Sequence, residues 1–325
     1  MPIGPTIADD TMRTPAAVKW GAESLWRDLN ALLPGLAVEV VDSCESTNTE
    51  LVERARRMSG LADQQLTRPG ELEPPISGPI PLAETTPLGR RANDTQPCLL
   101  VAETQTRGRG RLGRSWQSAE NTSLTFSLAL RFEPPDWSGL SLAVGVALAE
   151  AIDARTDRAG PRIALKWPND LMWCDGQGPS RKLGGILIET VPVGRRRMAV
   201  IGIGLNVAPL ADTTDLGHGY AHLQEIIPGI DPPAALRRVA PALLAAVLQF
   251  QRSGFASFKP RFEQRDDLAG RPVQGGPAEQ PIDGVALGID DLGALRVQVG
   301  EIVQTLSAGD VSVRAAADGD EGRRC

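Results

Sequence analysis

Residues 106–116 read TRGRGRLGRSW, which places four arginines around three glycines in a chain whose formal net charge is −6. A guanidinium group offers a planar fork of donors that matches carboxylate and phosphate oxygens. Interleaved glycines let the backbone approach a small anion closely. The segment therefore predicts a binding loop for an anion with several oxygens. A solvated arginine-rich turn and an RNA-contacting segment are the alternatives at this point.

The same stretch formally matches the glycine fingerprint of dinucleotide-binding folds, G-x-G-x-x-G, at residues 108–113. That fingerprint requires a helix that begins at its third glycine. Here RSWQSAENTS follows, and these residues have no helical periodicity. The sequence therefore disfavours a dinucleotide-binding fold.

Composition narrows the class of protein. The chain has 325 residues, of which 42% are hydrophobic and 23% charged, enough for one large domain and a smaller one. Its acidic balance argues against a general binder of nucleic acid or anionic membranes. The first twenty residues lack the continuous apolar segment typical of a signal peptide, and the longest uncharged apolar run is too short to span a bilayer. The scattered cysteines predict neither a zinc site nor a disulfide framework: Cys44, Cys98, Cys174 and Cys325. We expect a soluble cytoplasmic protein.

Hydrophobic patterning predicts an α+β fold with a mixed sheet, because several strands follow one another without a helix between them. Thr47 and Glu50 have capping-box spacing at the start of a helix. Further helices are expected over 138–155 and over 234–250, the latter interrupted at Pro241. The expected strands are residues 36–42, 98–106, 123–132, 162–167, 182–190 and 196–207.

Changes in local composition along the chain also predict its domain organisation. Residues 1–35 form an N-terminal extension to a main domain that spans 36–268. Within that domain, residues 59–97 contain seven prolines and little apolar periodicity, so we expect a surface insertion without a packed element. Short β-rich runs over 269–314 predict a small β-barrel-like domain, and 315–325 form a frayed tail.

Lysine is rare enough to be informative, since the chain has thirty arginines and four lysines. Lys166 begins KWPND (166–170), in which a proline-initiated turn presents Asn169 and Asp170. Lys182 begins KLGGILIE (182–189), where two glycines allow a ligand to lie flat against a strand. A third glycine-containing strand, GIGLN, ends at Asn206. These segments add cations and amides to the anion site that the arginine loop predicts.

In their order and residues, five segments resemble those of the biotin protein ligases: STN (46–48), GRGRLGRSW (108–116), KWPND (166–170), KLGGILIE (182–189) and GIGLN (202–206). The resemblance covers roughly residues 36–314. It implies a class II synthetase-like catalytic domain with a mixed sheet and an SH3-like C-terminal domain. It also implies an enzyme that activates biotin with ATP and Mg²⁺ to biotinyl-5′-AMP. Such an enzyme then transfers biotin to a lysine of the biotin carboxyl carrier domain of a carboxylase.

The resemblance also implies roles by position. The biotin site takes Ser46, Thr47, Asn48, Gln105, Arg109, Gly110, Arg111, Lys182 and Gly185. The nucleotide site takes Arg111, Trp116, Lys166, Asn169, Asn206 and Tyr220. Charge stabilisation during the reaction is assigned to Lys182, Arg109 and Arg111, and magnesium handling to Asp170.

Alternatives stay open beside this interpretation. The Ser-Thr-Asn triplet also fits a helix N-cap, and Trp116 also fits a core position. A lipoate ligase or acyltransferase of the same superfold is one rival function, and a non-catalytic biotin-sensing regulator is another. About forty residues precede STN, too few for a helix-turn-helix domain, so we expect a mono-functional ligase that does not bind DNA. A homodimer is a further expectation, taken from relatives that pair through sheet edges.

Overall fold

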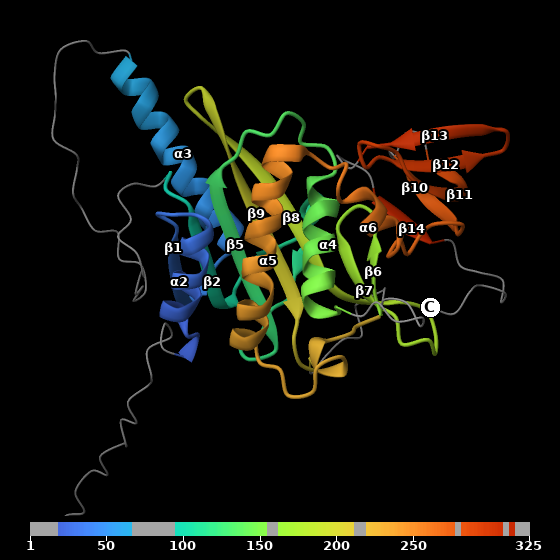
Figure 1. The fold of residues 1–325 in the computed structure, drawn as a ribbon, viewed down its shortest axis with the longest axis horizontal. Helices are drawn as coiled ribbons and strands as arrows, with labels where there is room; N and C mark the ends of the chain where they lie inside the picture. Colours follow the sequence, from blue (N-terminus) through green and yellow to red (C-terminus); the bar gives the residue numbers. More distant parts are fainter. Residues whose placement is uncertain are drawn as a thin grey trace, which may run out of the picture.

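The structure, a computed structural model, describes residues 19–66, 95–154, 162–210, 219–276, 281–307 and 312–315 (Figure 1). Most of the predicted proline-rich insertion, residues 67–94, lies outside these ranges, as do the first 18 residues and the tail from 316. The described residues form a seven-stranded mixed sheet and a separate five-stranded antiparallel sheet. This confirms the predicted α+β fold with a small β domain at the C-terminal end.

The large sheet has the strand order β1-β2-β5-β9-β8-β7-β6. Its β1 and β2 are parallel, and every other neighbouring pair is antiparallel. All six predicted strands are present, and β7 is the one that was missed. The bounds are β1 Ala37–Cys44, β2 Cys98–Gln105, β5 Ser123–Arg131, β6 Ile163–Lys166, β7 Asp170–Trp173, β8 Arg181–Val193 and β9 Arg196–Asn206.

Helices cover both faces of this sheet. On one face α4 (Leu140–Ile152) packs against α5 (Pro232–Ser253), and α2 (Ala22–Leu32) lies beside α5 (Figure 1). The other face carries α3 (Thr47–Leu66), which contacts β2, β5, β8 and β9. Ten of the thirteen residues of α4 are buried, because the sheet lies on one side of it and α5 on the other.

Strand alternation determines which side chains reach each face. On β9, Ala199, Ile201, Ile203 and Leu205 belong to the core beneath α4 and α5. Because side chains alternate along a strand, Gly202, Gly204 and Asn206 are directed to the face shared with α3. The same rule turns Ser127 of β5 toward α3, while Phe126 and Leu128 enter the core. In β5 and β9, the face beneath α4 and α5 is therefore apolar, whereas the α3 face combines small and polar residues with a second apolar cluster that includes Leu100, Met198 and Val200.

Two helix predictions were wrong. The prediction of a break at Pro241 fails because α5 runs unbroken from Pro232 to Ser253. Proline removes one helical hydrogen bond, but buried residues on both sides of it, including Val239 and Leu243, hold the helix against its neighbours. The helix α3 also continues to Leu66, eight residues into the segment predicted to have no regular structure. The structure adds α2 as well, which lies in the predicted N-terminal extension.

The C-terminal sheet has the order β13-β12-β11-β10-β14 and follows α6 (Lys259–Glu263). The connection between α6 and β10 contacts the large sheet at β6, where Leu165 pairs with Asp266. The indole Nε1 of Trp167 also donates to the carbonyl of Gly293, at 3.1 Å. The small domain therefore contacts the strand and turn that carry KWPND. Its bounds are β10 Pro272–Gly276, β11 Ile282–Ile289, β12 Leu295–Val299, β13 Ile302–Leu306 and β14 Ser312–Ala315.

Replacing Asp231 with alanine should destabilise the fold modestly. Asp231 is the N-cap of α5, and its Oδ1 accepts a hydrogen bond of 2.7 Å from the Ala234 amide. Loss of such a cap costs about 1 kcal/mol of the free energy of unfolding. Urea denaturation followed by circular dichroism measures the change. An unchanged midpoint would show that the cap contributes nothing.

Within the described ranges, no helix combines the length and apolar character needed to cross a membrane.

Candidate active site

A cavity lies on the α3 face of the sheet, between the ends of its central strands and the arginine loop. The loop folds as β3 (Gly108–Arg109), a short 3-10 turn over Arg111–Gly113, and β4 (Ser115–Trp116). No α-helix follows the third glycine, as expected for a segment that is not a dinucleotide fingerprint. Of the fifteen residues predicted for the site, thirteen line the cavity: Ser46, Thr47, Asn48, Gln105, Arg109, Gly110, Arg111, Trp116, Lys166, Asn169, Asp170, Lys182 and Gly185.

The cavity also contains residues to which no site role was assigned from the sequence. Ser127 is buried on β5 outside the motifs, and Gly202 and Gly204 of β9 belong to the GIGLN motif. A serine inside the apolar run SLTFSLALRF was a signal that could have identified Ser127. Val313 reaches the cavity from β14 of the small domain, and no local pattern reports such a contact.

The STN segment both caps a helix and lines the cavity. The Ser46 hydroxyl accepts from the Thr49 amide at 3.4 Å, so Ser46 occupies the N-cap position at the start of α3. The predicted capping box between Thr47 and Glu50 is wrong. Thr47 is already helical, and the Glu50 carboxylate instead accepts from Arg54 at 2.7 Å. This leaves the side chains of Thr47 and Asn48 available to the cavity.

A chain of hydrogen bonds runs along the cavity floor from STN. Gln105 Oε1 accepts from the Thr47 amide at 2.7 Å, and the hydroxyls of Thr47 and Ser127 lie 2.7 Å apart. Ser127 donates to Asn48 Oδ1 at 2.7 Å, and Asn48 Nδ2 donates to Glu189 Oε2 at 3.0 Å. Thr47, Asn48 and Ser127 are almost fully buried. These side chains are therefore held in fixed orientations, as a specific polar binding site requires.

This series of hydrogen bonds ends at the arginine loop. The Arg109 guanidinium pairs with Glu189, with Nη2 and Oε1 3.1 Å apart, and donates to the Thr49 hydroxyl at 3.2 Å. Glu189 thus connects β8, α3 and the loop. The motif KLGGILIE contains this residue, but the motif gave no indication of its role.

Lys182 and Asp170 form the charged centre of the cavity. Lys182 Nζ lies 2.9 Å from Asp170 Oδ1. Arg111 donates to Asn169 Oδ1 at 3.3 Å, and Asn169 is held in turn by a 2.8 Å bond to the Ile186 carbonyl. Burial lowers the pKa of Lys166, an effect that Asp170 and Asp267 partly offset.

Positive charge dominates the cavity. Its described lining contains five cationic side chains, Arg109, Arg111, Arg114, Lys166 and Lys182, against one carboxylate, Asp170. An acidic chain thus concentrates cations where several negative oxygens can bind. No group of three or more potential metal ligands occurs among the residues that the structure describes.

Glycines on β9 make room for two of the cavity side chains. A Cβ on Gly204 would lie 2.5 Å from the Trp116 ring, and one on Gly202 would lie 2.3 Å from Asn48 Oδ1. Real Cβ atoms do not approach other atoms this closely. The glycines of GIGLN therefore let Trp116 and Asn48 lie directly against the strand.

Replacing Gly204 with alanine should displace Trp116. Overpacking of this kind costs about 1–3 kcal/mol of the free energy of unfolding. Thermal unfolding measures this cost, and calorimetry with ATP tests whether the cavity loses affinity with it. Gly178→Ala is the matched control, because nothing lies within 4 Å of its added Cβ. Equal stability of the two variants would contradict the packing argument.

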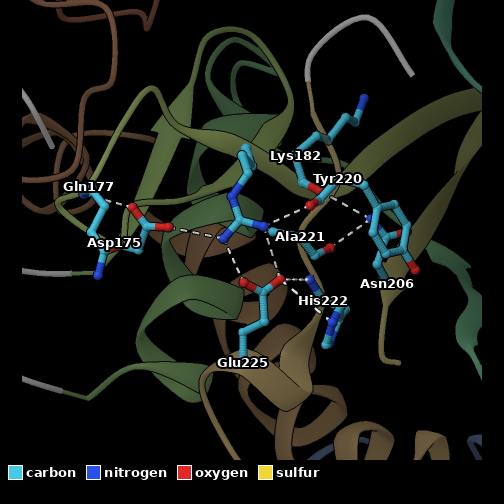
Figure 2. A network of polar contacts seen from close by, with 9 residues as sticks. Asp175, Gln177, Lys182, Asn206, Tyr220, Ala221, His222 and Glu225 are labelled. Atoms are coloured by element: carbon cyan, nitrogen blue, oxygen red, sulfur yellow. Dashed lines mark hydrogen bonds and ion pairs between the residues drawn. The ribbon is translucent and has the colours of Figure 1, made fainter. Parts of the chain in front are cut away.

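Asn206 and Tyr220 are the two predicted residues that do not line the cavity. The Asn206 amide donates to the carbonyls of Lys182 and Ala221, at 3.1 and 3.0 Å (Figure 2). The Tyr220 hydroxyl donates to the Ala208 carbonyl at 2.8 Å. Both residues therefore hold the backbone beside the cavity.

Comparison with known proteins agrees with this geometry. The biotin–[acetyl-CoA-carboxylase] ligase of Mycobacterium tuberculosis is 31% identical over 222 residues, which cover 67% of this chain and 79% of that protein. The chain belongs to the biotin protein ligase family. Models of the biotin/lipoate A/B protein ligase family and of the biotin protein ligase C terminal domain match residues 90–206 and 269–314 of this family member.

Two further relatives extend the comparison. A bifunctional ligase/repressor of Escherichia coli is 34% identical over 220 residues, and the match spans 66% of this ligase family member and 66% of the relative. Among solved structures, the biotin protein ligase of Aquifex aeolicus in complex with biotin and ATP has a TM-score of 0.61 and 25% identity. That match covers 86% of this chain and 99% of the Aquifex chain.

Proposed function

We propose that this chain activates biotin with ATP to biotinyl-5′-AMP and transfers the biotin to a lysine of a biotin carboxyl carrier domain. The observation that carries the proposal is the cavity itself, in which a buried polar floor adjoins five cations and one carboxylate. The family relationship adds support, since relatives are named for this reaction. The lining suits electrostatic stabilisation of a reaction between two anions.

The polar floor is the proposed site of the biotin ring system. Thr47, Gln105 and Ser127 supply adjoining hydrogen-bond donors and acceptors, which suit the cyclic urea of biotin. Gly202 lets Asn48 lie against the strand next to them, and Gly185 keeps β8 open beside Lys182. The biotin carboxylate is then directed toward Lys182.

In the first step, a biotin carboxylate oxygen attacks the α-phosphorus of ATP, and the bond to the β-phosphate oxygen breaks with release of pyrophosphate. The difficulty of this step is to bring two anions together. Lys182 and Arg111 screen that repulsion and stabilise the charge that develops. Trp116, Lys166 and Asn169 line the part of the cavity that is proposed to hold the nucleotide. The residues of this chain therefore position the two substrates and neutralise their charge, and the enzyme need not form a covalent bond to either of them. A part for Asn206 and Tyr220 in adenine recognition stays a prediction.

Magnesium is proposed to enter with ATP. Asp170 is the single carboxylate of the described lining and already pairs with Lys182, so this lining offers at most one carboxylate ligand. This fits Mg²⁺, which is commonly held by one or two carboxylates together with substrate phosphates and waters. When bound, the ion would neutralise phosphate charge.

In the second step, the amine of an acceptor lysine attacks the acyl carbon of the mixed anhydride. An amide bond forms, AMP leaves, and the amine loses a proton to solvent. The intermediate must be kept from water until the acceptor arrives. The arginine loop, held through Arg109 and Glu189, is the segment that covers it. Three further points stay predictions: the protein is located in the cytoplasm, it does not bind DNA, and it forms a homodimer.

The test is a direct assay. The purified chain is incubated with biotin, ATP, magnesium and a biotin carboxyl carrier domain. We expect one biotinyl group on one acceptor lysine, together with AMP and pyrophosphate. Parallel reactions with lipoate and a lipoyl domain separate the rival ligase, and modification there without biotinylation would overturn the proposal. Binding of biotin without AMP release would instead indicate a non-catalytic sensor.

A further inference from the structure

The backbone of Lys182 lies at the start of β8, beyond the point where β8 pairs with β9. On β8, Lys182 pairs with Met172 of β7, but the pairing with β9 begins only at Gly184. The segment 219–221 takes the position that β9 leaves open. The Lys182 amide donates to the Gly219 carbonyl at 3.2 Å, and the Lys182 carbonyl accepts from Ala221 at 3.0 Å. A short parallel bridge thus extends the sheet at the residue that carries the central cation of the cavity.

Arg181 fastens this segment from the neighbouring position. Its Nη1 donates to the Tyr220 carbonyl at 2.9 Å and to Glu225 Oε1 at 3.2 Å. Its Nη2 reaches Glu225 Oε2 at 2.6 Å and Asp175 Oδ2 at 3.1 Å. The guanidinium therefore makes a two-pronged contact with one carboxylate while it also binds a second carboxylate and a backbone carbonyl.

The partners of Arg181 are themselves held in place. Glu225 Oε1 accepts from the His222 amide at 3.0 Å, which secures the turn η2 (Leu223–Glu225). Asp175 Oδ1 accepts from the Gln177 amide at 2.8 Å in the connection before β8. In Figure 2 the Lys182 side chain points away from this network, while its backbone carbonyl lies within it. One arginine therefore joins three segments that are separate in the sequence.

Close packing provides an independent sign that the contact is built in. A Cβ on Gly219, whose φ is +66°, would lie 3.0 Å from Arg181 Cγ. The stem of Arg181 therefore lies against a glycine backbone, where a larger residue would push it away. Arg181 does not line the cavity, so any effect on the reaction must pass through the backbone of Lys182 and the segment 219–221.

We propose that Arg181 is a positioning residue, which locks the segment 219–225 onto β8 and so sets the position of Lys182 for the reaction with ATP. Its ion pairs are partly exposed, with 31% of the Arg181 side chain accessible, and such pairs add little to global stability. The lock therefore acts on local geometry. The kinetic part of this inference rests on the proposed function.

Kinetics of biotinyl-adenylate formation test the lock, with Arg181→Gln as the main variant. We expect kcat/KM for ATP to fall by about ten- to hundredfold, because small misplacements of a charged group are costly to such reactions. The KM for biotin should change little, since the proposed ring site is formed by Thr47, Gln105 and Ser127, which are not among the hydrogen-bond partners of Arg181. Arg181→Lys should recover only part of the loss, because an ammonium group cannot make the forked contact with Glu225. Arg195→Gln, on the exposed β8–β9 turn, is the matched control.

Amide hydrogen exchange on the substrate-free protein gives a readout that does not depend on activity. In Arg181→Gln, the peptide that covers residues 219–225 should exchange about tenfold faster, while strand β9 stays protected. Unchanged exchange there overturns the lock, whether or not the chain is a ligase. Faster exchange in a chain that makes no biotinyl-adenylate would support the lock and refute the proposed function. A thermal midpoint lowered by more than about 5 °C, with biotin and ATP kinetics equally impaired, would reduce Arg181 to a general structural role and also overturn the inference.

Discussion

Replacing Lys182 with methionine is expected to slow biotinyl-adenylate formation by about a hundred- to a thousandfold, the usual cost of removing one preorganised charge donor. Lys182 Nζ lies in the cavity 2.9 Å from Asp170, where the reacting carboxylate and phosphate are proposed to meet. Methionine keeps much of the side-chain volume and removes the charge. Pyrophosphate release with saturating biotin and ATP measures the step.

Two controls make the Lys182 result specific. Lys259→Met removes another rare lysine, one that lies on α6 and pairs with Asp291 outside the cavity. It should leave adenylation unchanged. Lys182→Arg keeps the positive charge but changes its shape and reach, so it should retain more activity than Lys182→Met. Equal activity of Lys182→Met and the parent would remove the central element of the proposed mechanism.

Replacing Arg111 with glycine should make the enzyme release its intermediate. Arg111 lines the cavity and contacts Asn169, next to the Lys182–Asp170 pair, so it is placed to bind the adenylate. A hydrogen bond to a charged group contributes about 1.5–3 kcal/mol. Its loss should therefore speed release of biotinyl-AMP by about ten- to a hundredfold. Biotinylation of a bystander protein that lacks a carrier domain reports the leak.

Arg109→Gly provides the informative comparison. The family resemblance implies that both arginines belong to the biotin site, and in the structure Arg109 pairs with Glu189 and binds the Thr49 hydroxyl. Its removal should loosen the loop and cause a smaller leak than Arg111→Gly. Arg107→Gly, whose side chain is 77% exposed, should cause none. A larger leak from Arg109→Gly than from Arg111→Gly would reverse the roles assigned to the two side chains.

The motifs predicted many of the cavity residues because each motif reflects a constraint on the backbone or side chains of a few neighbouring residues. A glycine beside an arginine, or a proline turn after a lysine, constrains a few neighbouring residues, and those constraints are visible in their spacing. The missed residues entered by contacts between distant segments. Ser127 joins through Thr47, Glu189 joins through Asn48, and Val313 arrives from another domain. Spacing along the chain does not report such contacts.

Asn206 illustrates the same limit. Its position at the end of GIGLN predicted a ligand contact, and strand alternation directs its side chain away from the apolar core. In the structure its amide nitrogen donates to the carbonyls of Lys182 and Ala221, and adenine recognition by this residue stays a prediction. That outcome depends on the bridge between Lys182 and Tyr220, which are 38 positions apart in the sequence.

The sequence by itself determined the α+β class, the strands that carry the motifs, and the concentration of cations in an acidic chain, because periodicity and residue chemistry act over short stretches. Only the tertiary structure decided which of those cations share a cavity, which arginine faces Asn169 and which faces Glu189, and how Arg181 holds the edge beside Lys182. Those outcomes depend on the pairing and packing of distant segments. The free energy gained by burying apolar surface and the entropy lost on ordering the chain depend on the whole fold, so short stretches of sequence do not reveal these contacts.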